Sequence, residues 1–217
     1  MKGLLRNNYY ASRSTTGYFL VIMVCFGVFA ILVDNVNSSF LIRYMLIGIV
    51  GFPVLTVSAL QRDSACKWAK YKLTAPVKRV DIIKSYYITH LAALFVGVAL
   101  AAVVVSMHVL LHGFPFDRNT DVLMLFTAGI DVGLFMGTFF YPLFYVNGEE
   151  RGEVTLLTSL ICAILIFMVL ISFINRLFPS PTTAQLIFIA AGLTMLAACC
   201  FVSSFPFACG IFRKKQY

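Results

Sequence analysis

Charged residues are scarce in this chain. Asp, Glu, Lys and Arg make up 12% of its 217 residues, whereas 60% of the residues are hydrophobic. Soluble domains carry roughly 25% charged and about 45–50% apolar residues, so a soluble globular domain of this length could not bury so much apolar surface. Intrinsic disorder is excluded as well, because it requires low hydrophobicity. The composition therefore predicts an integral membrane protein.

Several chemical signatures are missing too. The sequence has no GxxxxGK[ST] motif and no glycine-rich loop that could cradle a phosphate, so it predicts no nucleotide site of its own. The six cysteines include no Cys-x-x-Cys pair, which leaves no recognisable zinc site. No HExxH motif and no Ser/His/Asp set of a hydrolase is present. The sequence therefore predicts no catalytic residues, bound cofactor or metal.

The charged residues divide the chain into apolar stretches that are long enough to cross a bilayer, which takes about 20 helical residues. We expect an all-α membrane protein, a single transmembrane domain over residues 1–217 with six spans. The spans are expected at about 16–33, 40–60, 83–111, 122–146, 154–175 and 184–207. The last stretch is too short for two spans and a turn, and Pro179 and Pro181 break helix at its start.

The distribution of Lys and Arg predicts the orientation, because cytoplasmic loops carry an excess of both. With the N-terminus inside, only Arg43, Arg118 and Arg176 lie on the outer side, and the other 14 of the 17 basic residues lie on the inner side. Both termini are therefore expected in the cytoplasm. The net charge of +8 follows from this topology and from contact with anionic lipid, so it does not indicate binding to nucleic acid.

Residues 1–13 place Met1, Leu4, Leu5 and Tyr9 at helical spacing. This pattern favours a short interfacial helix that lies flat in the inner headgroup layer before the chain enters the membrane. The alternative is a frayed basic terminus.

The loop over residues 61–84 is long and basic, and Pro76 divides it. Its first half contains good helix formers and Trp68, and Pro76 can occupy the first turn of the helix that follows. One interpretation is a short transverse helix that presents a rigid contact to a cytoplasmic partner. The other is a basic loop that touches only anionic lipid. The residues alone favour neither.

Two segments resemble the ABC-2 type permeases, which are the membrane subunits of ATP-binding cassette exporters. Trp68 is followed by Leu-Thr-Ala-Pro-Val-Lys-Arg-Val-Asp-Ile-Ile-Lys-Ser-Tyr-Tyr over residues 73–87, similar to that family's loop between its second and third spans. Residues 147–153, Asn-Gly-Glu-Glu-Arg-Gly-Glu, resemble the family's turn between its fourth and fifth spans. The family's Glu-Lys-x-Gly start is Asp-Ser-Ala-Cys here, beginning at Asp63, and its final Arg is Glu153.

The resemblance implies that residues 63–73 form a coupling helix, which sits in a cleft of an ATPase subunit. It implies that a second permease chain, identical or different, completes the pathway, and that ATP and Mg²⁺ bind to the partner ATPase. It suggests export of amphipathic or antimicrobial peptides, or of other hydrophobic compounds, across a bacterial plasma membrane. The residues expected to couple to the ATPase are Asp63, Lys67, Trp68 and Lys70, with Glu149, Glu150 and Arg151 as a second contact.

Polar residues inside the predicted spans are candidates for the translocation pathway, because an ionisable group in a membrane is costly. Asp131 is the only acid deep within a span, and we expect it to face the interior of the bundle. His108 and His112 lie four residues apart near the outer end of their span, within expected reach of the span at 122–146. They could line a polar cavity, form hydrogen bonds between helices or, with a further ligand, bind a metal. His90 is expected at the interface or between helices.

Two other function classes remain open at this point. Glu149 and Glu150 are similar to the paired acids of CAAX-type intramembrane proteases, but Val154 occupies the position at which that motif has Arg. A membrane scaffold or immunity protein that works without ATP is the third class. Copurification of a cassette ATPase would separate transport from both alternatives.

Overall fold

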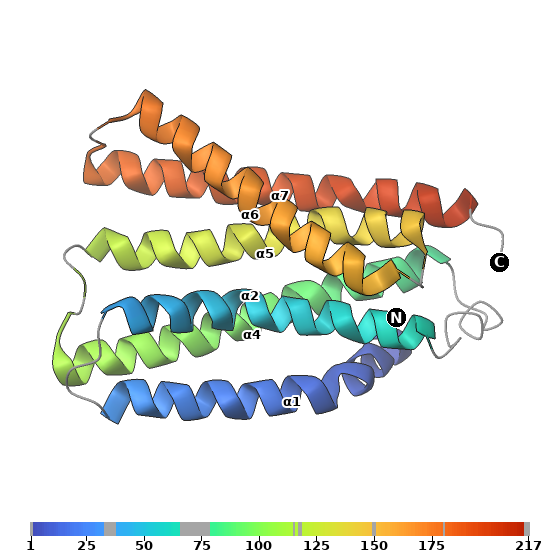
Figure 1. The fold of residues 1–217 in the computed structure, drawn as a ribbon, viewed down its shortest axis with the longest axis horizontal. Helices are drawn as coiled ribbons and strands as arrows, with labels where there is room; N and C mark the ends of the chain where they lie inside the picture. The colour runs from blue at the N-terminus through green and yellow to red at the C-terminus, as the bar shows by residue number, and fades with distance from the viewer. Residues whose placement is uncertain are drawn as a thin grey trace.

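The computed structural model describes residues 2–32, 38–65, 79–114, 116, 119–148, 151–179 and 181–214. Within these residues the regular elements are six long helices (Figure 1). Their bounds are α1 Lys2–Leu32, α2 Ser38–Ala65, α4 Arg79–His112, α5 Asn119–Asn147, α6 Gly152–Leu177 and α7 Thr183–Lys214. All six are long and apolar enough to cross a membrane. The prediction of an all-α protein with six spans is confirmed, including the single helix after Pro181.

The start of α1 and the end of α7 lie at the same end of the helices, together with the end of α2 and the start of α4 (Figure 1). We call this end the terminal end and the other the distal end. Several helices extend beyond their predicted spans toward the terminal end: α1 begins at Lys2, α2 continues to Ala65 and α7 continues to Lys214. The apolar stretches alone therefore underestimated how far the helices continue at this end.

The N-terminal residues differ from the prediction of a separate interfacial helix. Residues 2–13 are the first turns of α1, which runs without interruption to Leu32. Asn8 and Ser12 are buried there, and the Asn8 side-chain amide donates a hydrogen bond to Ser85 Oγ of α4 at 3.0 Å. Because this segment packs against its neighbours through polar contacts, it belongs to the bundle.

The start of the predicted coupling helix also differs from expectation. Asp63 falls inside α2, which continues to Ala65. The first residues assigned to the coupling helix are therefore an extension of the second span. The remainder of the predicted coupling helix, including Lys67, Trp68 and Lys70, lies outside the described residues.

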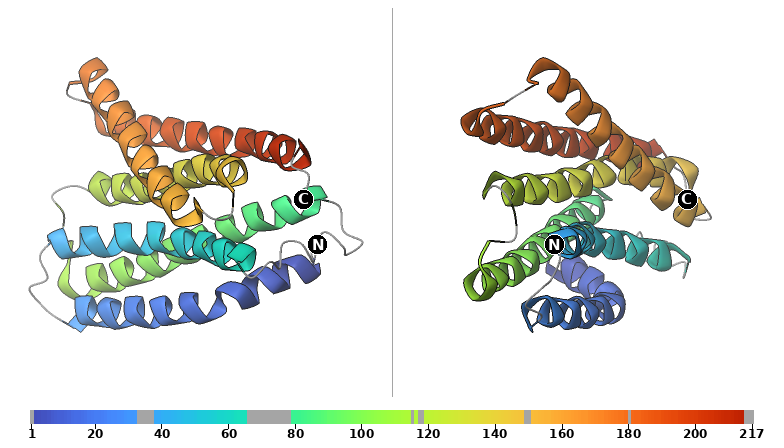
Figure 2. Two further views of the ribbon diagram at one scale, coloured as in Figure 1. Left: turned by 45° about the vertical axis from the view of Figure 1, so that its right-hand side comes forward. Right: turned by 60° about the vertical axis from the view of Figure 1, so that its left-hand side comes forward.

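The helix α5 occupies the centre of the fold, since it packs against α2, α4, α6 and α7. On the other side of the molecule, α2 packs against α1 and α4. Helix α6 is inclined to the others: it lies close to α5 at the terminal end and diverges from it toward the distal end (Figures 1 and 2). The buried residues of α6 accordingly all lie in its first half, at Gly152, Thr155, Ser159 and Ala163.

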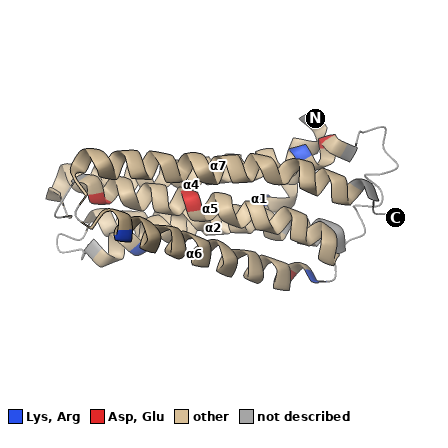
Figure 3. Cartoon of the chain, turned by 90° about the horizontal axis from the view of Figure 1, so that it is seen from above, with Lys and Arg blue, Asp and Glu red and all other residues tan. Residues whose placement is uncertain are grey.

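Charged residues of the described chain gather toward the two ends of the helices, and the long middle parts are mainly uncharged (Figure 3). Large apolar side chains cover the outer surfaces of α1, α6 and α7, including Tyr18, Phe188 and Met195, each more than 70% exposed. A surface of this kind is suited to hydrocarbon rather than to water. The fold is that of a multi-pass membrane protein.

Candidate functional site

The residues predicted to contact an ATPase are only partly described. Arg151 is exposed at the terminal end, where it precedes α6. Glu149 and Glu150, like Lys67, Trp68 and Lys70, lie outside the described residues. The structure does, however, describe the residues that flank both predicted contact segments.

The flanks of the two predicted contact segments are joined by a hydrogen bond. Gln61, near the end of α2, donates through Nε2 to the carbonyl oxygen of Gly152, the first residue of α6, at 2.6 Å. A Cβ at Gly152 would lie 2.9 Å from Cγ of Gln61, so glycine permits this approach. The end of α2 and the start of α6, which are 91 residues apart at this bond, are therefore joined directly.

The turn between α5 and α6 is held by its own polar contacts. Gly148 adopts a left-handed backbone conformation, with φ of 84°, and its N–H donates to the carbonyl oxygen of Phe144 at 3.1 Å. Glycine tolerates this conformation without steric cost and commonly ends helices in this way. The Asn147 side-chain amide donates to Thr155 Oγ1 at 3.2 Å, across the turn. The turn that carries the second predicted contact therefore has a defined start and end.

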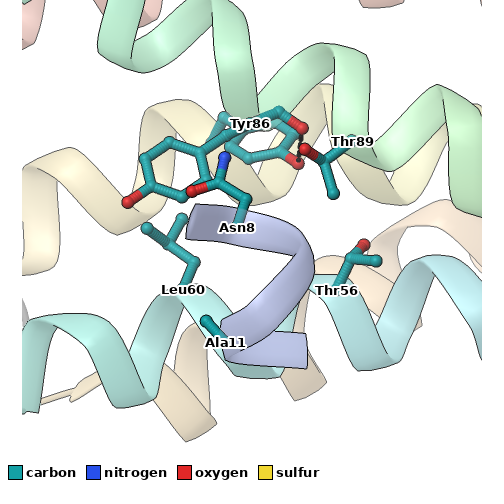
Figure 4. Close-up of a pocket in the computed structure, with 7 residues that line it drawn as sticks. Asn8, Ala11, Thr56, Leu60, Tyr86 and Thr89 are labelled. Carbon is teal, nitrogen blue, oxygen red and sulfur yellow. Dashed lines mark hydrogen bonds between the residues drawn. The ribbon is translucent and has the colours of Figure 1, made fainter. Parts of the chain in front are cut away.

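The first turns of α1 fit between α2 and α4 close to this region. Asn8 and Ala11 of α1 line a cavity of about 10 Å³ (Figure 4). The rest of its wall comes from α2, α4 and α5, through Thr56, Leu60, Tyr86, Thr89 and Tyr141. The cavity is barely large enough for one water molecule. The N-terminal segment of α1 is thus packed tightly against the helices that flank the predicted coupling segment.

Aromatic and polar side chains fill the core between α4, α5 and α7. The Tyr87 hydroxyl forms a hydrogen bond with Ser204 Oγ at 2.9 Å, and the Tyr87 ring stacks on Tyr141 with 4.3 Å between centroids. His90 is fully buried, donates through Nε2 to the carbonyl oxygen of Gly133 at 3.1 Å and stacks on Phe201. The prediction that His90 joins helices is confirmed, and its burial excludes the interfacial position.

His108 and His112 of α4 form hydrogen bonds with the end of α1. His108 Nδ1 donates to the carbonyl oxygen of Ala30 at 2.8 Å, and His112 Nε2 donates to that of Ile31 at 2.7 Å. Both acceptors lie in the last turn of α1, whose carbonyls have no partner within their own helix. The pair therefore joins α4 to the distal end of α1, so the expectation of hydrogen bonds between helices is confirmed, and the expected contact with α5 stays a prediction. Among the described residues, no three His, Cys, Asp or Glu side chains are grouped as a metal site.

Asp131 lies near the middle of α5 and is 1% exposed, so the prediction that it faces the bundle interior is confirmed. The Thr194 hydroxyl of α7 lies near its carboxyl group but donates to the carbonyl oxygen of Ala190 at 3.0 Å, and Oδ1 has no partner among the described residues. Asp131 also borders a cavity of about 220 Å³ between α5, α6 and α7. This cavity lies where α6 diverges from α5, and its wall is mainly apolar.

Three glycines lie on the face of α5 opposite to Asp131, and they were not predicted as important from the sequence. Gly129, Gly133 and Gly137 recur every fourth residue, and a Cβ on each would come within about 3 Å of a side chain on a neighbouring helix. Repeats of small residues at this spacing let helices approach closely in membranes. This spacing was the signal that could have identified α5 as the central helix.

Comparison with known proteins identifies one family. A family model described as "ABC-2 family transporter protein" matches residues 3–213, which include all six helices. No curated protein and no solved structure matches this chain.

Proposed function

Because the chain belongs to the ABC-2 family of transporter membrane proteins, we propose that it is the permease subunit of an exporter driven by a separate cassette ATPase. Family membership makes it a transport subunit rather than an enzyme in its own right. Apart from family membership, the main structural support for this proposal is the hydrogen bond from Gln61 to Gly152. It supports a single ATPase-contact surface built from residues 63–73 and 149–151, because it fixes the bases of both segments.

The proposed orientation has both termini and this contact surface in the cytoplasm. The charge distribution supports it, since 14 of the 17 Lys and Arg residues fall on that side. The common position of the start of α1 and the end of α7 at one end of the helices is compatible with it (Figure 1). ATP and Mg²⁺ would then bind on the partner ATPase, on the cytoplasmic side.

Movement of the contact surface would reach the bundle by two routes. The hydrogen bond from Gln61 to Gly152 would transmit the movement from α2 to α6. The hydrogen bond from Asn8 to Ser85 would transmit it between α1 and α4. Coupling of this kind needs packed elements with discrete arrangements. The tight fit of the first turns of α1 between α2 and α4 supplies such packing.

The remaining partners follow from the resemblance. A second permease chain, identical or different, would complete the translocation pathway in the plasma membrane of a bacterium. The cargo class that we propose is amphipathic, such as antimicrobial peptides or other hydrophobic compounds. The cargo would be moved outward, with Asp131, His108 and His112 as the candidate polar residues of the pathway.

Copurification tests the proposal directly. The tagged full-length chain, extracted in mild detergent, should carry a cassette ATPase with it, and the complex should hydrolyse ATP. A chain that is stable and active without any ATPase would favour the scaffold or enzyme alternatives instead.

Trp68 tests the contact surface within that complex. Aromatic anchors buried in an interface commonly cost about 2 kcal/mol or more when they are truncated, whereas charges at the rim cost much less. Trp68→Ala should therefore reduce ATPase copurification or uncouple ATP hydrolysis from export, while Lys67→Ala and Lys70→Ala act mildly and depend on salt. Tyr18→Ala is the matched control, because Tyr18 is 72% exposed on the outer surface of α1. A fully coupled Trp68→Ala complex would contradict the assignment of the contact surface.

A further inference from the structure

The cavity beside Asp131 has a polar inner end and apolar walls. Asp131 and Ala128 of α5, Ile171 and Asn175 of α6, and Ala190 and Leu193 of α7 contribute to its wall. Of these side chains, Asp131 lies deepest in the bundle, whereas Asn175 is exposed near the distal end of α6. The cavity therefore runs from a buried carboxyl group in the middle of the bundle toward the distal end, along aliphatic and aromatic side chains.

The carboxyl group of Asp131 is incompletely satisfied. A carboxylate can accept several hydrogen bonds, but Oδ1 has none from the described residues. The neighbouring hydroxyl of Thr194 donates to the carbonyl oxygen of Ala190 at 3.0 Å. The nearby hydroxyl of Thr127 donates to the carbonyl oxygen of Met124 at 2.9 Å, so its proton is already used. A buried acid in this state is costly unless a partner supplies hydrogen-bond donors.

We propose that this cavity binds an amphipathic cation, with an ammonium head at Asp131 and an apolar body along α6 and α7. The proposal rests on the proposed transport function and narrows its cargo class from amphipathic compounds to those that carry a protonated amine. A protonated amine supplies both the countercharge and the donors that Oδ1 lacks. The apolar body replaces lipid or empty space along the cavity wall.

The chemistry of the cavity disfavours the other ligand types. An anionic amphiphile would place like charges side by side, which costs energy in a low dielectric. A small hydrated cation would lose its water against apolar walls without an apolar body to compensate. A neutral chain could fill the cavity, but it would leave Oδ1 without a donor.

The experiment measures binding of octylammonium and of its neutral counterpart, octanol. The full chain is purified with the ATPase that accompanies it, reconstituted in nanodiscs of zwitterionic lipid and titrated with each labelled probe, with empty nanodiscs subtracted. We expect the wild type to prefer octylammonium by roughly tenfold to a hundredfold, the range of a charge-assisted hydrogen bond. Asp131→Asn should abolish this preference while octanol binding persists.

Two further variants separate the cavity from general effects. Asp121→Asn makes the same substitution in the first turn of α5, outside the cavity, and should leave the preference unchanged. Ala128→Leu adds volume to the cavity wall and should weaken binding of both probes by about tenfold. Ala128→Leu also keeps the test valid if Asp131→Asn fails to fold.

The outcomes distinguish this proposal from the proposed function. Equal binding of the two probes by the wild type would overturn the cation site, as would a preference that survives in Asp131→Asn. Either result, obtained with an ATPase still copurifying and hydrolysing ATP, would leave the transport function standing. If no ATPase copurifies but the preference depends on Asp131, the proposed function fails and the binding site stands.

Discussion

Opposite faces of α5 differ in how closely the neighbouring helices approach. On one face, a Cβ on Gly129, Gly133 or Gly137 would lie only 2.6–3.0 Å from a side chain of α2, α4 or α7, closer than an ordinary van der Waals contact. On the other face, Ala128 and Asp131 border the cavity that opens between α5, α6 and α7. One helix therefore combines a closed face and an open face.

The difference between the two faces shows how one membrane helix can both hold neighbouring helices together and line a binding cavity. Lipid tails are as apolar as the helices, so helices associate through close packing and through hydrogen bonds. The closed face has both kinds of contact at Gly133. His90 donates a hydrogen bond to the Gly133 carbonyl oxygen, and the Leu94 side chain packs against Gly133. The open face lacks this close packing, and its polar side chain, Asp131, borders the cavity where a ligand could bind. We expect stability to depend on the first face and cargo binding on the second.

The largest effect is expected from Gly137→Ala, on the closed face. Its Cβ would lie 2.6 Å from the Phe201 ring and 2.9 Å from His90 Nε2. These two buried rings stack on each other, so neither can withdraw easily. Overpacking of this kind typically costs about 1–3 kcal/mol, and denaturation of the purified protein in mixed micelles measures it.

Gly192→Ala is the matched control for that variant. Gly192 lies on the exposed face of α7 with no atom within 4 Å of a Cβ, so the free energy of unfolding should stay the same or rise slightly. If the two variants were equally stable, close packing would not distinguish the closed face.

A smaller effect of opposite sign is expected from Ala128→Leu, on the open face. The added carbons would make new van der Waals contacts inside the cavity, which should stabilise the protein by about 1 kcal/mol. The same substitution at Ala163, which is fully buried in α6, should destabilise it because no space is available there. Loss of stability in Ala128→Leu would show that the cavity is smaller or more rigid than described.

The sequence predicted the number and approximate position of the helices well, because apolar length and charge placement depend on local composition. It failed at the N-terminus, where the helical spacing of Met1, Leu4, Leu5 and Tyr9 predicted an interfacial helix in the segment that also contains the polar Asn8 and Ser12. Those polar side chains are buried instead, and the partner of Asn8 is Ser85, 77 residues away. Contacts over such distances cannot be derived from helical periodicity.

The same limit applies to the candidate site residues. The cost of an ionisable group in a membrane correctly predicted that Asp131 points inward. The cavity beside it depends on the inclination of α6, which no local pattern encodes. The spacing of His108 and His112 predicted that they share a face, yet it could not tell that carbonyl oxygens at the end of α1 accept their hydrogen bonds. The predicted ATPase contacts Lys67, Trp68 and Lys70 fall outside the described residues, so they remain predictions.

The smallest effect is expected from Tyr141→Phe, which removes a polar contact between α5 and α4. The Tyr141 hydroxyl donates to the Tyr86 carbonyl oxygen at 3.2 Å, whereas the ring of Tyr141 stacks on Tyr87. Phenylalanine keeps the ring, so only the hydrogen bond is lost, and such bonds in membrane proteins average about 0.6 kcal/mol. Tyr18→Phe, which alters a hydroxyl on an exposed side chain, should leave stability unchanged. A cost for Tyr141→Phe as large as that of Gly137→Ala would mean that hydrogen bonds, rather than close packing at the glycines, hold the buried surface of α5 together.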